Sequence, residues 1–111
     1  MSEAADITNK IINQFYIDGA YAWRASSVGV YDKKMGQFRA APKKGVSDIL
    51  AVYIGTFIAV EVKMGLDRMS DEQIGFQENI KHAKGEVYVA KNFEGFLAWW
   101  SGVRTRLSGG G

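Results

Sequence analysis

Three charged residues lie in a stretch that otherwise has the composition of buried β-strands. In GVSDILAVYIGTFIAVEVKMG, residues 45–65, Asp48 begins one aliphatic segment, and Glu61 and Lys63 end the next. Two close carboxylates among apolar neighbours need a positive partner. A hard divalent cation would meet this need, and a lysine beside it could hold or deprotonate an attacking water. The residue types suit metal-assisted hydrolysis of a phosphate ester, and a strand-end ion pair with Lys63 is an equal alternative.

A hairpin predicted in this stretch would bring the charges together. Strands over residues 48–54 and 57–63 flank Gly55-Thr56, and a type II′ turn favours glycine at its first position. With this turn Asp48 faces Lys63, and Glu61 lies diagonally from Asp48 on the same face. We therefore predict one patch of three charges, conditional on the two-residue turn, because an odd-length turn or a bulge changes the pairing.

The spacing of apolar residues predicts the elements around the hairpin. Residues 3–17 form a first helix, Ser70 starts a second that stops near Gly85, and Asn92 caps a third with an aromatic stripe. Irregular strands are expected between residues 20 and 32, and the strand EVYVA covers residues 86–90. The order αβ(β)ββαβα, with a helix crossing over between aliphatic strands, predicts an α/β fold with a mixed β-sheet flanked by helices.

Length and composition set outer bounds. The 111 residues suit one domain, and 47% hydrophobic content is ordinary for a folded protein. The absence of cysteine excludes disulfides, zinc–thiolate sites and thiol nucleophiles. With no membrane-length apolar run and no signal peptide at its start, we expect a soluble, intracellular protein. Residues 108–111, SGGG, are expected to be a flexible tail.

Positive charge is concentrated in one segment although the net charge is only +2. Residues 19–47 contain six cations and a single acid, a local charge of +5. Such an excess suits a polyanion, most commonly a phosphate backbone, and a solvated loop is an equal alternative on charge alone. The six cations are Arg24, Lys33, Lys34, Arg39, Lys43 and Lys44.

Two further polar residues have two interpretations each. Glu3 stands four and eight residues before Ile7 and Ile11, which predicts an inward-facing acid, although a first-turn glutamate also suits the helix dipole. Gln73 is predicted on a buried helix face near the site. It is also the last residue of a capping box that starts at Ser70, and we weigh cap and site equally.

The pattern as a whole resembles the PD-(D/E)XK nuclease superfamily, and within it the virus-type replication-repair nuclease (VRR-NUC) domain of stand-alone phage-like members. The matching pieces are Glu3, AWRASSVGVYD with the basic loop, KGVSDIL, FIAVEVK and MSDEQIGF, over residues 2–96. Ser47 replaces the proline that usually precedes the first acid. The resemblance implies a restriction-endonuclease-like core, a mixed β-sheet flanked by helices, in a single nuclease domain over residues 1–107.

The resemblance also implies roles for individual residues. Asp48, Glu61 and the backbone carbonyl of Val62 would bind Mg²⁺ or Mn²⁺, and Lys63 would serve the nucleophilic water. Glu3 would complete the acidic cluster directly or through water. The other implied roles are orientation of Lys63 or the substrate by Gln73, and DNA binding by Arg24, Lys33, Lys34, Arg39, Lys43 and Lys44.

The implied protein is a metal-dependent DNA endonuclease that acts on branched or Holliday-junction DNA in repair. By analogy it is a cytoplasmic homodimer from a phage or its bacterial host. The alternative is a non-catalytic nucleic-acid-binding module with a nuclease fold. On the last helix, Phe93, Phe96 and Trp100 are expected in the core, and Trp99 is predicted to be exposed and available to a dimer interface.

Overall fold

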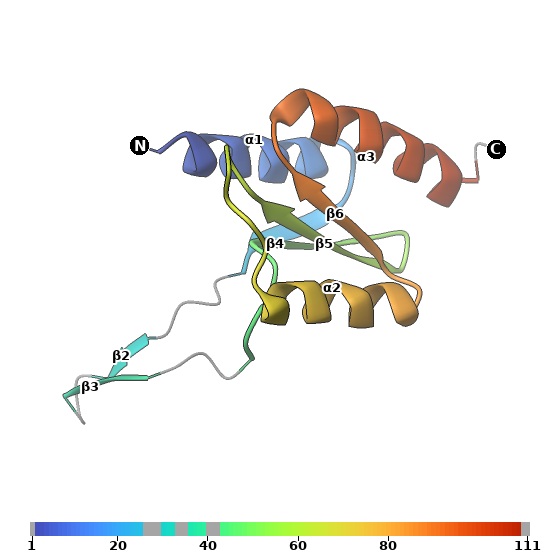
Figure 1. Ribbon diagram of the computed structural model, residues 1–111. Helices are drawn as coiled ribbons and strands as arrows, with labels where there is room; N and C mark the ends of the chain where they lie inside the picture. Colours follow the sequence, from blue (N-terminus) through green and yellow to red (C-terminus); the bar gives the residue numbers. More distant parts are fainter. Residues whose placement is uncertain (1, 26–29, 33–35, 40–42, 110–111) are drawn as a thin grey trace.

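The computed structural model describes residues 2–25, 30–32, 36–39 and 43–109. The helices and strands follow the predicted order, with one addition: the single optional strand before the hairpin is a pair of short strands. The elements, shown in Figure 1, are α1 (Glu3–Ile17), β1 (Tyr21–Arg24), β2 (Val30–Asp32), β3 (Gln37–Arg39), β4 (Ile49–Tyr53), β5 (Thr56–Val62), α2 (Asp71–His82), β6 (Glu86–Ala90) and α3 (Phe93–Leu107).

The predicted mixed sheet is confirmed. Its strand order is β1-β4-β5-β6, with antiparallel pairing of β1 to β4 and of β4 to β5. β6 runs parallel to β5, because α2 crosses over between them. β2 and β3 pair in a separate two-stranded sheet. Figure 1 shows α1 and α3 on one face of the main sheet and α2 on the other.

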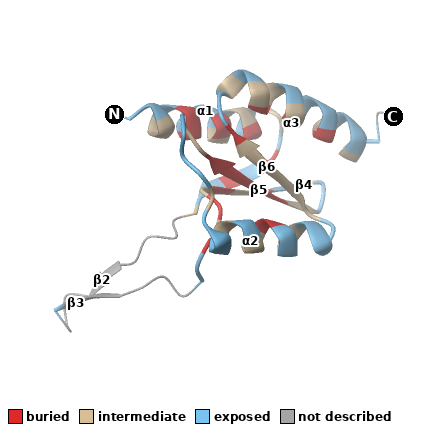
Figure 2. Cartoon of the chain, viewed as in Figure 1, coloured by how far each residue is buried: buried red, intermediate tan, exposed pale blue. Residues whose placement is uncertain are grey.

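The core lies between the sheet and the α1–α3 layer. Phe15 of α1 meets Phe96 and Trp100 of α3 edge-on, with ring centroids 5.2 and 4.8 Å apart. Ile58 and Val60 of β5 belong to the same buried cluster. Figure 2 shows this burial as red segments on β5 and on the inner sides of both helices. The aromatic stripe predicted for the last helix is therefore confirmed.

The prediction of an exposed Trp99 is wrong. Its ring stacks on Tyr88 of β6 with centroids 4.8 Å apart, and it is partly buried against the core. An aromatic ring on the neighbouring strand accounts for the difference, since helical spacing alone cannot reveal such a partner.

On the other face of the sheet, Gln77 links α2 to β6. Its side-chain amide donates to the carbonyl of Tyr88 (3.1 Å).

Side-chain caps define where the helices begin. The side chain of Ser2 accepts from the backbone N–H of Ala5 at the start of α1, and the side chain of Asn92 accepts from the backbone N–H of Gly95 at the start of α3.

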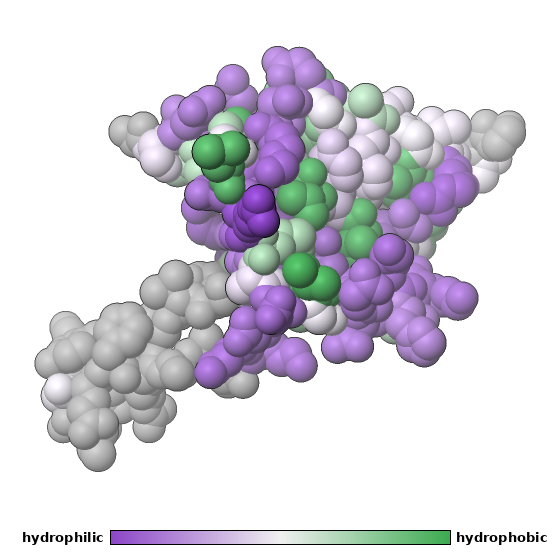
Figure 3. All heavy atoms as spheres, in the orientation of Figure 1, coloured by the Kyte–Doolittle hydropathy of each residue, from purple (hydrophilic) through white to green (hydrophobic). Residues whose placement is uncertain are grey.

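On the face shown in Figure 3, hydrophilic residues cover much of α2, and apolar residues appear between the two helical layers. No helix in the described ranges is long and apolar enough to cross a membrane.

Strand β1 lies at one edge of the sheet, and the end of α1 covers part of this edge. The hydroxyl of Tyr16 donates to the carbonyl of Ala22 (2.8 Å), so this carbonyl is not open to another strand. The rings of Tyr16 and Tyr21 also meet edge-on, with centroids 6.4 Å apart. The end of the helix therefore wraps around the edge of the sheet.

The turn between β4 and β5 lies one residue earlier than predicted. Tyr53 pairs with Thr56, so the two turn residues are Ile54 and Gly55, with φ angles of 48° and 76°. Two positive φ angles define a type I′ turn rather than type II′. The prediction failed because aliphatic Ile54 is typical of a strand, and of the two turn residues only Gly55 belongs to a type that favours a positive φ.

This turn shifts the strand pairing by two residues and keeps the faces unchanged. The ladder ends at Ile49 paired with Val60, and one step beyond it Asp48 comes opposite Glu61 rather than Lys63. A shift of two preserves the alternation of side chains, so all three charges still share one face. The predicted convergence therefore survives, with the two acids as direct neighbours.

Gly45 permits a close approach between the segment before β4 and the first turn of α2. A Cβ atom at this position would overlap the carbonyl oxygen of Glu72 and would lie 2.8 Å from the backbone nitrogen of Gln73. The backbone of Gly45 also has a φ of +79°. Both the contact and the dihedral angle therefore require glycine.

Replacing Ile54 with asparagine should stabilise the chain. Asparagine adopts positive φ far more readily than a β-branched residue, and Asn-Gly is the preferred type I′ pair. We expect Ile54→Asn to raise the free energy of unfolding by about 1 kcal/mol, measured by urea denaturation in dilute protein. Ile74→Asn, which replaces an exposed isoleucine of α2, is the control and should give no gain.

Replacing Gly45 with alanine should be strongly destabilising. We expect a loss of at least about 3 kcal/mol, because the new methyl group meets backbone atoms that cannot move aside cheaply. Gly19→Ala is the matched control, since Gly19 has a φ of +88° and a Cβ added there would have nothing within 4 Å. It should lose only about 1 kcal/mol, and equal losses in urea denaturation would show that the contact with α2 is dispensable.

Candidate active site

Asp48 is held at the junction of three strands. Its carbonyl accepts from the backbone N–H of Ala25, just beyond β1 (2.8 Å), and its Oδ2 accepts from the backbone N–H of Val62 in β5 (2.8 Å). The side chain takes the place of a ladder hydrogen bond at the point where β4 and β5 separate. This contact fixes the carboxyl beside the end of β5.

Glu61 brings a second carboxyl to the same point from a buried strand. Its side chain is only 1% exposed. Burial, then the hydrogen bond with Asp48 and the charge of Asp48, raise the pKa of Glu61 from 4.5 to about 9. Glu61 is therefore protonated at neutral pH in the metal-free protein. Within the described residues, its Oε2 atom is buried without a hydrogen-bond partner.

Lys63 follows two residues later on the same face of β5. Its positive charge acts on Glu61 in the opposite sense to burial and lowers the pKa of that carboxyl, but less strongly. Its backbone N–H donates to the carbonyl of Ala90 (2.9 Å), which keeps the end of β5 beside β6. The structure thus brings Asp48, Glu61 and Lys63 into one electrostatic group, as predicted.

Gln73 forms the cap that the sequence allowed. Its Oε1 accepts from the backbone N–H of Ser70 (2.9 Å), and its own backbone N–H donates to the hydroxyl of Ser70 (3.1 Å). Both halves of the capping box are therefore present. Through the contact of Gly45 with the first turn of α2, this cap lies against the segment that leads to Asp48.

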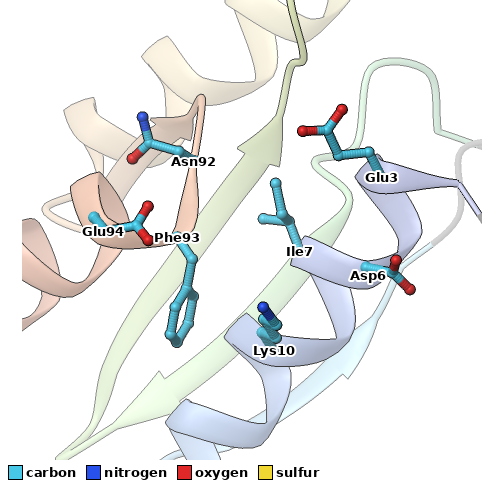
Figure 4. A pocket seen from close by; sticks show the side chains of 7 residues that line it. All are labelled: Glu3, Asp6, Ile7, Lys10, Asn92, Phe93 and Glu94. Atoms are coloured by element: carbon cyan, nitrogen blue, oxygen red, sulfur yellow. The ribbon is translucent and has the colours of Figure 1, made fainter.

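Glu3 is not on a buried face, and that part of its prediction is wrong. It is an exposed first-turn residue of α1 and lines a pocket between the starts of α1 and α3, as Figure 4 shows. The helix begins at Glu3, so the residue stands at the open end of the helix, where spacing no longer implies burial. Across the described parts of the chain, no three acidic or histidine side chains gather into a metal-binding group.

The basic segment is described only in part. Arg24 donates to Oδ1 of Asn9 (2.8 Å), so its partner is an amide rather than a carboxylate. Lys43 and Lys44 are exposed in the segment that leads to Asp48. Predicted DNA contacts that lie outside the described residues are Lys33, Lys34 and the side chain of Arg39.

Sequence reasoning did not identify two residues that shape the site. Gly45 sets the distance between α2 and the segment before Asp48, and its position between a basic pair and a strand was the only signal. Ser47 is fully buried, and its hydroxyl has no hydrogen-bond partner within the described residues. A serine before the first acid is visible in the sequence, but its burial is not.

The donor set suits a hard divalent cation. One carboxyl oxygen of Glu61, without a hydrogen-bond partner among the described residues, lies beside the carboxyl of Asp48, and a bound cation would stabilise both in their charged forms. The two carboxylates and the carbonyl of Val62 could supply oxygen ligands, with water completing the shell. A bound cation would therefore give the carboxyl oxygen of Glu61 a partner and would offset the repulsion between the two carboxylates.

Comparisons with known proteins locate the fold. No protein-family model and no curated protein sequence matches the chain. Among solved structures, the chain is similar to Hjc, a Holliday junction resolvase from the archaeal hyperthermophile Archaeoglobus fulgidus. The TM-score is 0.55 at 24% sequence identity, over 79% of this chain and 67% of that one. The chain therefore has a restriction-endonuclease-like fold, as the resemblance implied.

Proposed function

We propose that the protein is a metal-dependent DNA endonuclease that hydrolyses phosphodiester bonds in branched DNA, such as Holliday junctions. The observation that carries the proposal is the buried oxygen of Glu61 beside Asp48, which has no partner in the described part of the chain, with Lys63 on the same face. Its fold is shared with a Holliday junction resolvase, which supports the choice of substrate. The order Asp48, Glu61, Lys63 is that of the PD-(D/E)XK nucleases, and we assign the chain to their VRR-NUC branch as a phage-like member.

The proposed metal ligands are Asp48, Glu61 and the backbone carbonyl of Val62. A bound Mg²⁺ or Mn²⁺ would polarise a phosphate oxygen and stabilise the charge that develops during hydrolysis. The N–H of Val62 holds the carboxylate of Asp48 beside the end of β5. Glu61 must first lose its proton, because a protonated carboxyl binds a cation poorly.

Lys63 is proposed to hold or deprotonate the attacking water. Its place two residues after Glu61 puts its amine on the face that carries both acids. Gln73 is proposed to orient Lys63 or the substrate, and the cap on Ser70 uses its Oε1 and backbone N–H but not its Nε2 group. Glu3 is proposed to contribute from α1 through a water molecule.

The DNA is proposed to lie along the basic segment that precedes Asp48. Exposed Lys43 and Lys44 would contact phosphates without reading bases, which suits recognition of shape rather than sequence. A homodimer would present two such sites, one for each strand of a junction. Further proposed contacts are Arg24, Lys33, Lys34 and Arg39.

Cleavage of a labelled four-way junction in Mg²⁺ or Mn²⁺ tests the proposal. Asp48→Asn, Glu61→Gln and Lys63→Ala should each lower the single-turnover rate by at least about a hundredfold. The matched controls are Glu78→Gln and Lys81→Ala, which change exposed residues of α2 and should leave the rate unchanged.

The same experiment separates cleavage from simple binding. Binding of the junction with no cleavage by the wild type in either metal would indicate a non-catalytic module with a nuclease fold. Full activity in the three site variants would show that the active site lies elsewhere in the protein. A comparison of junction, flap and plain duplex DNA tests the preference for branched substrates.

Metal binding should depend on pH through Glu61. Because the pKa of Glu61 in the metal-free protein is about 9, a proton competes with the cation at every pH below that value. The affinity for Mn²⁺ should rise by up to about tenfold per pH unit, and binding at neutral pH should release about one proton.

Calorimetry in buffers of different ionisation enthalpy measures both quantities. Glu61→Gln should remove the proton release together with most of the binding, and Glu78→Gln should change neither. Mn²⁺ binding that is independent of pH, or that releases no proton, would contradict the assignment of Glu61 as a ligand.

A further inference from the structure

Large apolar side chains gather at one corner of the sheet, at the end of the strands away from the acids. Tyr21 of β1 is 66% exposed, and it pairs across the strands with exposed Val52 of β4. The ring of Trp23 lies 5.5 Å from that of Tyr21, and Tyr16 meets Tyr21 from α1. We call this surface the β1 patch, and its residues are Tyr16, Tyr21, Trp23, Val52 and Ile54.

The β1 patch lies on the face of the sheet that carries α2, in a part that α2 does not cover. Ala22 and Ala51 belong to the core under α1 and α3, so the alternate residues Tyr21 and Val52 face the side that carries α2. α2 packs on β5 and β6. Tyr21 and Val52 on the β1–β4 side of this face therefore remain open to solvent.

Ile54 supplies an independent reason to expect a partner at this corner. It is 62% exposed and has a φ of 48°, which is unfavourable for a β-branched residue. Asparagine or glycine would fit the turn better and would not expose an apolar side chain. A strained, exposed isoleucine at the tip of the hairpin is accounted for if its side chain is buried by a contact outside this chain.

The character of the patch indicates a protein surface as its partner. None of its five residues carries a charge, whereas contact with a DNA backbone depends on cations. Tyrosine and tryptophan are enriched in the centres of protein interfaces. The carbonyl of Ala22 at the sheet edge is already bound by Tyr16, so a partner would contact side chains rather than extend the sheet there.

Its size suits a second copy of the chain. From their exposed fractions, the five side chains present roughly 500 Å² of surface. A stable interface buries about 800 Å² per partner, including a polar rim. An uncharged apolar surface can pack against itself about a two-fold axis, because the same residues then meet on both sides.

We infer that the β1 patch is the interface of a homodimer, with Ile54 and Tyr21 near its centre. The acids lie at the far ends of β4 and β5 from the Ile54–Gly55 turn, so packing at the turn leaves both sites accessible. The dimer would hold two acid pairs in fixed orientation on a common body. Its role in cutting both strands of a junction rests on the proposed function, but the interface itself does not.

Sedimentation velocity over a wide range of protein concentrations, without DNA and with a chelator, tests the interface. The wild type should dimerise. Ile54→Asn should weaken the dimer by at least about tenfold, although it should stabilise the dilute chain, and Tyr21→Asp should give monomers. Ile74→Asn, which changes an exposed isoleucine on α2, should leave the dimer intact. Circular dichroism checks that each variant is folded.

Three results would overturn the inference. The wild type could remain monomeric at the highest concentration, Ile54→Asn and Tyr21→Asp could dimerise as tightly as the wild type, or Ile74→Asn could weaken the dimer as much as they do. Junction cleavage is measured separately on the same proteins. A dimer that dissociates in the patch variants but never cuts DNA supports the interface and contradicts the proposed nuclease.

Discussion

The carboxyl of Glu61 is buried in the most deeply packed strand of the sheet, and the site is organised around the cost of that burial. A charged glutamate in such a place is unfavourable, and the neighbouring Asp48 makes it more so. In the metal-free protein Glu61 is protonated at neutral pH, so it carries no charge there. One oxygen of Glu61 still lacks a partner within the described residues, so it could serve as a ligand to a cation. The strand is buried on both faces, and this keeps the acid from swinging out into solvent.

The backbone around this pair shows how local geometry produces the arrangement. The left-handed turn at Ile54-Gly55 sets the register that puts Asp48 opposite Glu61. The N–H of Val62 then fixes the aspartate, and Gly45 allows the first turn of α2 to lie against the segment before it. Each device is a backbone feature, so the acids are positioned by the hairpin and the crossover helix rather than by a network of other charged side chains.

Much of this could be predicted from the sequence because the signals were local. The first helix over residues 3–17, the helix starts at Ser70 and Asn92, the strand EVYVA and the aromatic stripe of α3 all follow from caps and periodicity, and all are present. Features that depend on tertiary context were missed. Ile54 adopts a dihedral angle that its residue type disfavours, Trp99 has a partner on another strand, and Glu3 stands at a helix end where periodicity does not define a buried face. The grouping of Asp48, Glu61 and Lys63 was predicted despite a wrong turn, because an error of two residues in register leaves the faces of both strands unchanged.

The hydrogen bond from Tyr16 to Ala22 also bears on how the edge of β1 is exposed during translation. A free sheet edge is a template on which other unfolded chains can assemble into aggregates. α1 precedes β1, so the ribosome releases the tyrosine before the strand that it protects. A helix forms within about a microsecond, far faster than new residues are added. The residue that covers the Ala22 carbonyl is therefore already in the nascent chain when this edge of β1 emerges.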